Sequence, residues 1–261
     1  MMGPAHSLSG AAAWLVTGAV AAGLDHPMPW PVLVAGALVC SGAALAPDLD
    51  QKSATISRAF GPLSRALCGV IDKLSTVVYN ATRGPLDRRR SGGHRTLTHT
   101  WPWALFIGTM FSTLAVLGGR WAVLGILFIH MVLAVEGLLW RAARVSSDVL
   151  VWLLGAATAW ILAGVMDEPG NGSNWLFTGQ EYMWLGLPIV LGALVHCVGD
   201  ALTISGAPLL WPLKVARRRW YPLGTPRFMR FRAGSWVEVK VLMPGFMVVG
   251  AVSGLGALLL G

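Results

Sequence analysis

Charged residues are scarce in this sequence. Asp, Glu, Lys and Arg make up 12% of the 261 residues, whereas a typical soluble domain has about 25%. Hydrophobic residues make up 55%, 13 residues are Trp, and the mean hydropathy is +0.62. This balance excludes an ordinary water-soluble domain and predicts an integral membrane protein.

Cysteines, and basic residues near the N-terminus, are also scarce. The three cysteines cannot form a disulfide framework, because Cys40 and Cys197 fall in apolar runs and Cys68 lies in a basic stretch. The first apolar run is preceded by no Lys or Arg, although a signal peptide usually begins with positive charge. We therefore expect packed cysteines and an uncleaved first helix.

Long apolar runs are abundant. A bilayer core of about 30 Å needs roughly 20 apolar residues per helix, and shorter runs suffice where the bilayer thins. The sequence predicts an all-α, polytopic transmembrane bundle that forms a single domain over residues 1–261. Its seven predicted helices cover residues 7–24, 31–47, 100–118, 121–140, 148–166, 183–205 and 239–260.

Two polar insertions interrupt these runs, at 48–98 and 207–238. The first contains apolar residues at helical spacing, which predicts an amphipathic helix on the membrane surface, broken near Gly61 and Pro62. The residues in this pattern are Phe60, Leu63, Leu67, Val70, Ile71, Leu74 and Val77. The second insertion is rich in Pro, Arg and Trp without periodicity, and we expect a packed loop.

Basic residues indicate the orientation. If the N-terminus is cytoplasmic, both insertions and the loop 141–147 are cytoplasmic too, and nineteen of the twenty Lys and Arg lie on that side. Only Arg120 falls outside, and the predicted outer loop 166–182 has no basic residue. The net charge of +8 is then explained by topology and by anionic lipid headgroups. The arginines at 88–90 lack a nucleic-acid-binding motif, so no nucleic-acid partner is expected.

Ionisable residues at the ends of membrane helices indicate a functional site. His196 and Asp200 are spaced i, i+4, so both can face one ion, or the histidine can simply donate to the carboxylate. Asp48 and Asp50 follow Pro47 and would suit a cation, or form a solvated helix end.

The stretch GGHRTLTHT supplies the remaining candidates. His94 and His99 can meet if Gly92 and Gly93 let the loop fold back. Thr98 is expected to cap the following helix, and Arg95 to bind an anion beside the cation site.

Seven candidate ligands fall at the cytoplasmic boundary in this topology: His6, Asp48, Asp50, His94, His99, His196 and Asp200. Together they could hold one zinc ion or a two-metal centre. The other two histidines serve as controls. His26 is expected in an outer loop, and His130 is expected to be packed within the membrane, with Glu136 as its partner.

The order of these motifs resembles a known family. An N-terminal His, PDLD, HRTLTHT and HCVGDALTISGAPLLWPL, followed by FRAGSWVE, are similar to the YdjM-like family of LexA-regulated, membrane-bound, metal-dependent hydrolases. The resemblance implies an inner-membrane hydrolase whose motif positions are the seven ligands above, supported by Arg95, Thr98 and Thr203. The basic stretch 52–90 is expected to be peculiar to this chain and to affect what reaches the site.

We therefore expect a hydrolase that uses a divalent metal, with zinc favoured and one or two ions bound. His94, His99, His196 and Asp200 would be core ligands, with Asp48 and Asp50 as bridging ligands or base. The predicted catalytic residues are Asp50, Arg95 and Thr98. A phosphoester of a lipid or of a lipid-linked substrate is the expected substrate class, because the site lies at headgroup depth beside basic residues. Arg58, Arg65 and Lys73 would hold anionic headgroups near the opening.

Other interpretations stay open at this point. An amide or peptide is a second possible substrate. A metal-ion transporter would place polar residues at several depths, and a non-catalytic module would use the metal only to clamp helices together.

Overall fold

The computed structural model describes residues 1–143, 145–177 and 180–260. Within these ranges the chain forms helices, turns and isolated β-bridges, without a β-strand. All seven apolar runs predicted as helices are helical. The elements are α1 (Gly3–Gly23), α2 (Trp30–Ala43), η1 (Ala46–Asp50), α3 (Ile56–Ala59), α4 (Pro62–Thr82), η2 (Leu97–His99), α5 (Trp101–Leu138), α6 (Trp140–Ala143), α7 (Asp148–Asp167), η3 (Met183–Leu185), α8 (Gly186–Ala201), η4 (Arg227–Met229), η5 (Glu238–Leu242) and α9 (Met243–Leu260).

Helix α5 folds back on itself at Gly119, whose φ of 57° breaks the helical geometry. A straight helix rises 1.5 Å per residue and would hold Phe111 and His130 about 28 Å apart. Their ring centroids lie only 5.4 Å apart. The two halves therefore pack as a helical hairpin, which agrees with separate predicted helices at 100–118 and 121–140.

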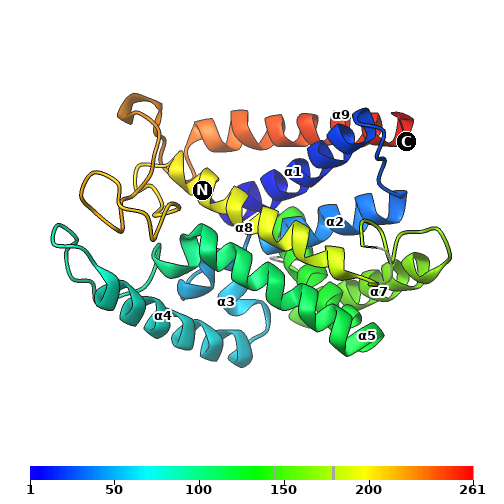
Figure 1. Cartoon of the computed structure of the whole chain (residues 1–261), viewed down its shortest axis with the longest axis horizontal. Coiled ribbons are helices and arrows are strands. Elements are labelled where there is room, and N and C mark those ends of the chain that lie inside the picture. The colour runs from blue at the N-terminus through cyan, green and yellow to red at the C-terminus, as the bar shows by residue number, and fades with distance from the viewer. Residues whose placement is uncertain (144, 178–179, 261) are drawn as a thin grey trace.

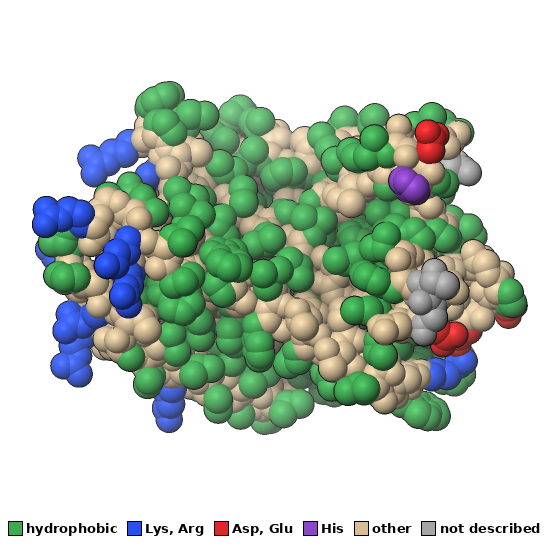
Figure 2. Space-filling view, viewed as in Figure 1, with side chains coloured by type: hydrophobic (Ala, Val, Ile, Leu, Met, Phe, Trp, Pro, Cys, Tyr) green, Lys and Arg blue, Asp and Glu red, His purple; other side chains and the backbone are tan. Residues whose placement is uncertain are grey.

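Within the described ranges, five helical segments are long and apolar enough to cross a membrane: Trp30–Asp50, Trp101–Leu138, Asp148–Asp167, Met183–Ala201 and Glu238–Leu260. Segment Trp101–Leu138 contains both halves of the α5 hairpin, and α1 is not among the five. Large apolar side chains are exposed on the outward faces, and α9 is the least covered, with 11% of its apolar window buried. Figure 2 shows a broad hydrophobic surface between the two ends of the molecule.

Glycines bring the helices that carry the candidate ligands close together. A Cβ atom at Gly10 of α1 would lie 2.6 Å from the Cys40 carbonyl oxygen of α2, and one at Gly192 of α8 would lie 2.5 Å from the same oxygen. Small residues allow such close backbone approach between membrane helices. Helices α1 and α8 therefore both pack closely against the last turns of α2.

Helix α4 confirms the predicted amphipathic helix, but its apolar stripe points away from the protein. Leu63, Val70 and Val77 are 74%, 61% and 64% exposed, whereas Ser64, Cys68, Ser75 and Tyr79 are buried. The small and polar face of α4 packs against η1, α3 and the loop before η2. The outward stripe is available to lipid.

Both insertions and the N-terminus gather at one end of the molecule (Figure 1). The Asp87 carboxylate ties the insertions together by accepting from the backbone N–H groups of Gly84, Arg219 and Trp220. The 207–238 segment is a loop, as predicted, with only the short η4 turn before η5 begins. It is less packed than expected, because more than half of its residues are exposed, including Phe228 and Trp236. Figure 2 shows the Lys and Arg side chains concentrated at this end and acidic side chains at the other.

Candidate metal centre

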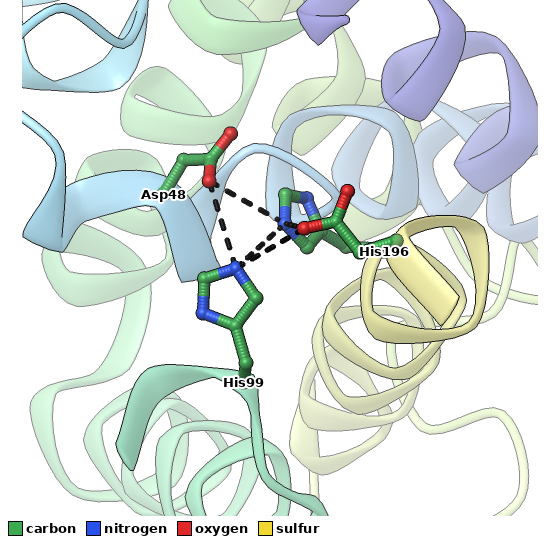
Figure 3. Close-up of side chains that lie close together, drawn as sticks. Asp48, His99 and His196 are labelled. Atoms are coloured by element: carbon green, nitrogen blue, oxygen red, sulfur yellow. Dashed lines mark hydrogen bonds and ion pairs between the residues drawn. The ribbon is translucent and has the colours of Figure 1, made fainter. Parts of the chain in front are cut away.

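Four side chains from three parts of the chain converge where η1, η2 and α8 meet. The Nε2 atoms of His99 and His196 lie 3.2 Å apart. Asp48 Oδ1 lies 3.6 Å from each of them, and Asp200 Oδ2 lies 3.5 Å and 3.7 Å from them. In Figure 3, Asp48, His99 and His196 point toward one another.

Hydrogen bonds fix the direction in which both imidazoles point. His196 Nδ1 lies 2.7 Å from the Ala44 carbonyl oxygen, so Nδ1 carries the proton and donates it. His99 Nδ1 lies 2.9 Å from Thr98 Oγ1, which in turn donates to Asp50 Oδ2 at 2.6 Å. Both Nε2 atoms therefore face the same point, and each presents a lone pair there when its imidazole is neutral. Metal-binding histidines are commonly held in this way.

The donor set and its spacing fit zinc. Zinc binds imidazole nitrogen and carboxylate oxygen at about 2.0–2.2 Å in a tetrahedron, which places ligand atoms about 3.3–3.6 Å apart. The five ligand-to-ligand distances given above run from 3.2 to 3.7 Å. The two facing ring nitrogens need either a proton or a metal ion between them. His99, His196, Asp200 and Asp48 could thus hold one ion.

A second potential ligand group adjoins the first. It consists of Asp48, Asp50 and His94, and Asp48 belongs to both groups. His94 Nδ1 lies 2.8 Å from Asp50 Oδ1, and the His94 side chain is 35% exposed. The shared carboxylate would allow two neighbouring ions.

The carboxylates make the site attractive to positive charge. Burial alone lowers the pKa of His99, which precedes the membrane helix α5. Hydrogen bonds to Asp200 and Asp48 outweigh burial and raise that pKa to about 9. The surroundings of His99 thus favour a cation.

Asp200 is held by further partners. Arg95 donates to Asp200 Oδ2 at 2.9 Å, and the Met1 amino group lies 2.5 Å from Oδ1. Arg95 also donates to Thr203 Oγ1 and to the Gly206 carbonyl. Its φ of 57° is unusual for a residue other than glycine. Arg95 therefore orients a predicted ligand, a role that its position in the sequence did not reveal.

His6 lies beside the cluster but outside both ligand groups. Its ring stacks on His196 with centroids 3.7 Å apart, and its Nε2 lies 3.4 Å from Asp200 Oδ1. The residue is fully buried, and neither ring nitrogen has a hydrogen-bond partner among the described residues. All seven predicted ligands are thus brought together, with His6 at the edge.

The predicted helix cap was wrong. Thr98 does not cap α5; Thr100 does, accepting from Trp103 N. Thr98 instead lies in η2, where it joins Asp50 to His99. The alternative interpretation of Asp50 as part of a solvated helix end is excluded, because it is 3% exposed and both its oxygens are hydrogen-bonded.

The loop and the control histidines were predicted more accurately. Gly93 lets the loop fold against α4, since a Cβ there would lie 2.5 Å from the Asp72 carbonyl oxygen. His130 is buried, as expected, but its Nδ1 donates to the Ile126 carbonyl rather than to Glu136. His26 is exposed before α2. The Ala44 carbonyl is a site partner that side-chain motifs could not reveal.

Two cavities border the cluster. The larger, about 660 Å³, has Asp48 in its wall, together with Arg58, Arg141 and Lys240. The smaller, about 240 Å³, is bordered by His94, Arg95 and Arg90. The larger cavity therefore reaches the four-residue cluster at Asp48, and the smaller one reaches the adjoining ligand group at His94.

The fold and the site define a helical membrane protein with a buried His/Asp cluster at one end of its bundle. The YdjM inner membrane protein family matches residues 1–139 and 147–259, and the chain belongs to this family. The match runs through the basic stretch 52–90 without a break. No curated protein and no solved structure matches the chain.

Proposed function

We propose that the protein is a metal-dependent hydrolase that cleaves a phosphoester of a membrane lipid. The observation that carries the proposal is the convergence of two imidazole nitrogens and two carboxylate oxygens beside an open cavity. Zinc is the favoured metal, because the donors are nitrogen and oxygen at tetrahedral spacing. The shared Asp48 leaves room for one or two ions.

An accessible site favours catalysis over a structural clamp. A structural zinc site is closed by four protein ligands, whereas a catalytic site has three protein ligands and an open position. His99, His196 and Asp200 would supply three ligands here if Asp48 acts as the base beside the open position. The Asp48 side chain is 21% exposed, while those of His99, His196 and Asp200 are at most 2% exposed. The cluster thus has one open side, and that side faces the 660 Å³ cavity.

The core beyond the site argues against transport. A transporter would need polar groups along a path through the bundle. The neighbouring buried cluster is apolar and includes Trp14, Leu33, Val39, Trp184 and Ile189. This favours catalysis at the cluster over transport of an ion through the bundle.

Each residue has a proposed task. A divalent ion would supply Lewis acidity, polarising the phosphoryl group and making water more acidic. Asp48 is the carboxylate in position to accept a proton, because it borders the cavity. Asp50 fits that task less well, since both its oxygens are hydrogen-bonded. Thr98 and Arg95 position His99 and Asp200.

We propose that the site faces the cytoplasm of a multi-pass inner-membrane protein, because Lys and Arg gather at the site end. Single cysteines test this orientation. In a background lacking Cys40, Cys68 and Cys197, Ser53→Cys and Ser91→Cys should resist an impermeant thiol reagent in intact cells. Asn174→Cys should react. The reverse pattern would make the substrate extracytoplasmic.

The activity itself can be tested with detergent-purified protein. We expect hydrolysis of a phosphate-bearing lipid that stops after chelation and returns with added zinc. A His99→Ala variant is the matched inactive control. Metal-loaded protein that cleaves no phosphate lipid, while a peptide substrate is cleaved, would contradict the phosphoester assignment.

A further inference from the structure

The larger cavity beside the cluster has two kinds of wall. Its lining includes three cations from three different elements: Arg58 of α3, Arg141 of α6 and Lys240 of η5. All three are exposed. Asp48 is the only acidic side chain in this lining. The cavity therefore has a positive rim around the open side of the candidate metal centre.

The other wall is apolar and belongs largely to α9. Met243, Pro244 and Met247 line the cavity from this helix, opposite Leu45 and Ile56. Helix α9 packs against α1, where Gly250 lies close to Ala12 and Leu15. Its outer face exposes apolar side chains, including Met247 at 60%. The cavity thus lies beside a helix that is covered on one side only.

Its volume also suits an organic ligand. A cavity of about 660 Å³ lies within the range of about 300–1,000 Å³ that is typical of small-molecule sites. The Arg141 guanidinium lies over the Trp140 ring, 5.2 Å from its centroid, so this part of the rim is held in place. Of the three cations expected near the opening, Arg58 lines the cavity, whereas Arg65 and Lys73 do not.

We propose that this cavity binds a lipid with a terminal phosphate, which arrives sideways from the bilayer past α9. Arg58, Arg141 and Lys240 would hold the phosphate, and Met243 and Met247 would contact the hydrocarbon chain. Three cations match a phosphate monoester, which carries about −1.5 to −2 charge at pH 7, better than a phosphodiester. This inference rests on the proposed function, because Asp48 belongs both to the cavity wall and to the candidate metal centre, so that a phosphate bound in the cavity would lie beside the metal.

The corresponding reaction is hydrolysis of a lipid phosphate monoester. The bond between phosphorus and the lipid oxygen breaks, and phosphorus bonds to the oxygen of water. A proton from water passes to the lipid oxygen. The products are a lipid alcohol, which stays in the bilayer, and inorganic phosphate, which leaves into water.

Binding can be measured without turnover. Metal-free protein in nanodiscs is incubated with phosphatidic acid carrying a photoreactive group in its acyl chain, and the labelled residues are mapped by mass spectrometry. We expect labelling near Met243 and Met247. Each cation facing an anionic lipid contributes about fivefold in affinity, so Arg58→Gln with Lys240→Gln should reduce labelling about 25-fold.

A matched control uses the same residue types elsewhere at the basic end. Lys214→Gln with Arg227→Gln should label like wild type, because neither residue lines this cavity. Equal labelling of both double variants, or labelling confined to other helices, would overturn the inference. Competition by inorganic phosphate as strong as that by phosphatidic acid would also overturn it, since the site would then bind free phosphate.

The two proposals fail in different ways. If the probe labels α9 as expected but metal-loaded protein hydrolyses no lipid phosphate, the binding site stands and the hydrolase proposal falls. If lipid phosphate is hydrolysed but the Arg58 and Lys240 variants change neither labelling nor KM, the hydrolase proposal stands and the cavity assignment falls.

Discussion

Two buried histidines in different regions show what makes a metal ligand in this protein. His196 in α8 and His130 in α5 both lie in long apolar helices, and both donate from Nδ1 to a backbone carbonyl at 2.7 Å. The His130 ring then packs edge-on against Phe111. The His196 ring faces His99 and two carboxylates. Burial and a fixed tautomer are common to both histidines. The groups around Nε2 therefore distinguish the candidate metal ligand His196 from His130.

The largest expected effect separates these two histidines directly. His196→Gln should lower zinc affinity by more than about 100-fold, because losing a supporting partner already costs about 10–100-fold. His130→Gln should leave affinity near wild type. Isothermal titration of metal-free protein measures both. Equal losses would show that the metal binds elsewhere or that both variants disturb the fold.

Thr98 offers a second way to sharpen the comparison. Its hydroxyl joins His99 Nδ1 to Asp50 Oδ2, a link that His130 lacks. Thr98→Val should weaken zinc binding by about 10–100-fold while keeping the side-chain shape. Thr17→Val removes an exposed hydroxyl bonded to the Ala13 carbonyl and is the matched control. An unchanged zinc affinity for Thr98→Val would remove this link from the account.

Arg95 and Arg120 extend the comparison to the two ends of the bundle. Arg95 pairs with the buried Asp200, whereas Arg120 pairs with Asp167 and is 49% exposed. Arg95→Ala should destabilise the protein by about 1.5–3 kcal/mol and weaken zinc binding, because hydrogen bonds to buried charged groups contribute that much. Arg120→Ala should cost at most about 1 kcal/mol. Thermal unfolding with and without zinc distinguishes them, and a larger loss for Arg120 would contradict the assignment.

The smallest expected effect concerns α4. Leu67→Ser and Val70→Ser lie on its outward apolar stripe, where the side chains are 46% and 61% exposed. In the full chain, these variants should leave zinc affinity unchanged. In an isolated peptide that covers α4, which needs no metal, the same substitutions should weaken binding to anionic vesicles by a few-fold. Serine variants on the buried face, such as Cys68→Ser, are the matched control in the full chain. A loss of zinc from Leu67→Ser would show that this face packs on protein.

Much of the fold followed from the apolar runs, because about 20 apolar residues per helix is a strong constraint. The sequence predicted separate helices at 100–118 and 121–140, and the turn at Gly119 divides α5 between them. The direction of the α4 stripe could not be predicted in the same way. An amphipathic pattern identifies two faces but does not say whether lipid or protein covers the apolar one.

The candidate ligands were found from residue type and common depth, and the structure brings them together. Their supporting contacts were not predictable. Thr98, Asp50 and Arg95 act through partners between 1 and 111 residues away along the chain. The Ala44 carbonyl that orients His196 has no sequence signal, because every residue has one.

The most direct test of the central claim is X-ray absorption at the zinc edge on detergent-purified protein, combined with elemental analysis. The account predicts one or two zinc ions per chain, bound by nitrogen and oxygen at about 2.0–2.2 Å without sulfur. Neither potential ligand group includes a cysteine, so a sulfur ligand would contradict the His/Asp assignment. Protein that is metal-free and cannot be loaded with zinc would contradict the account.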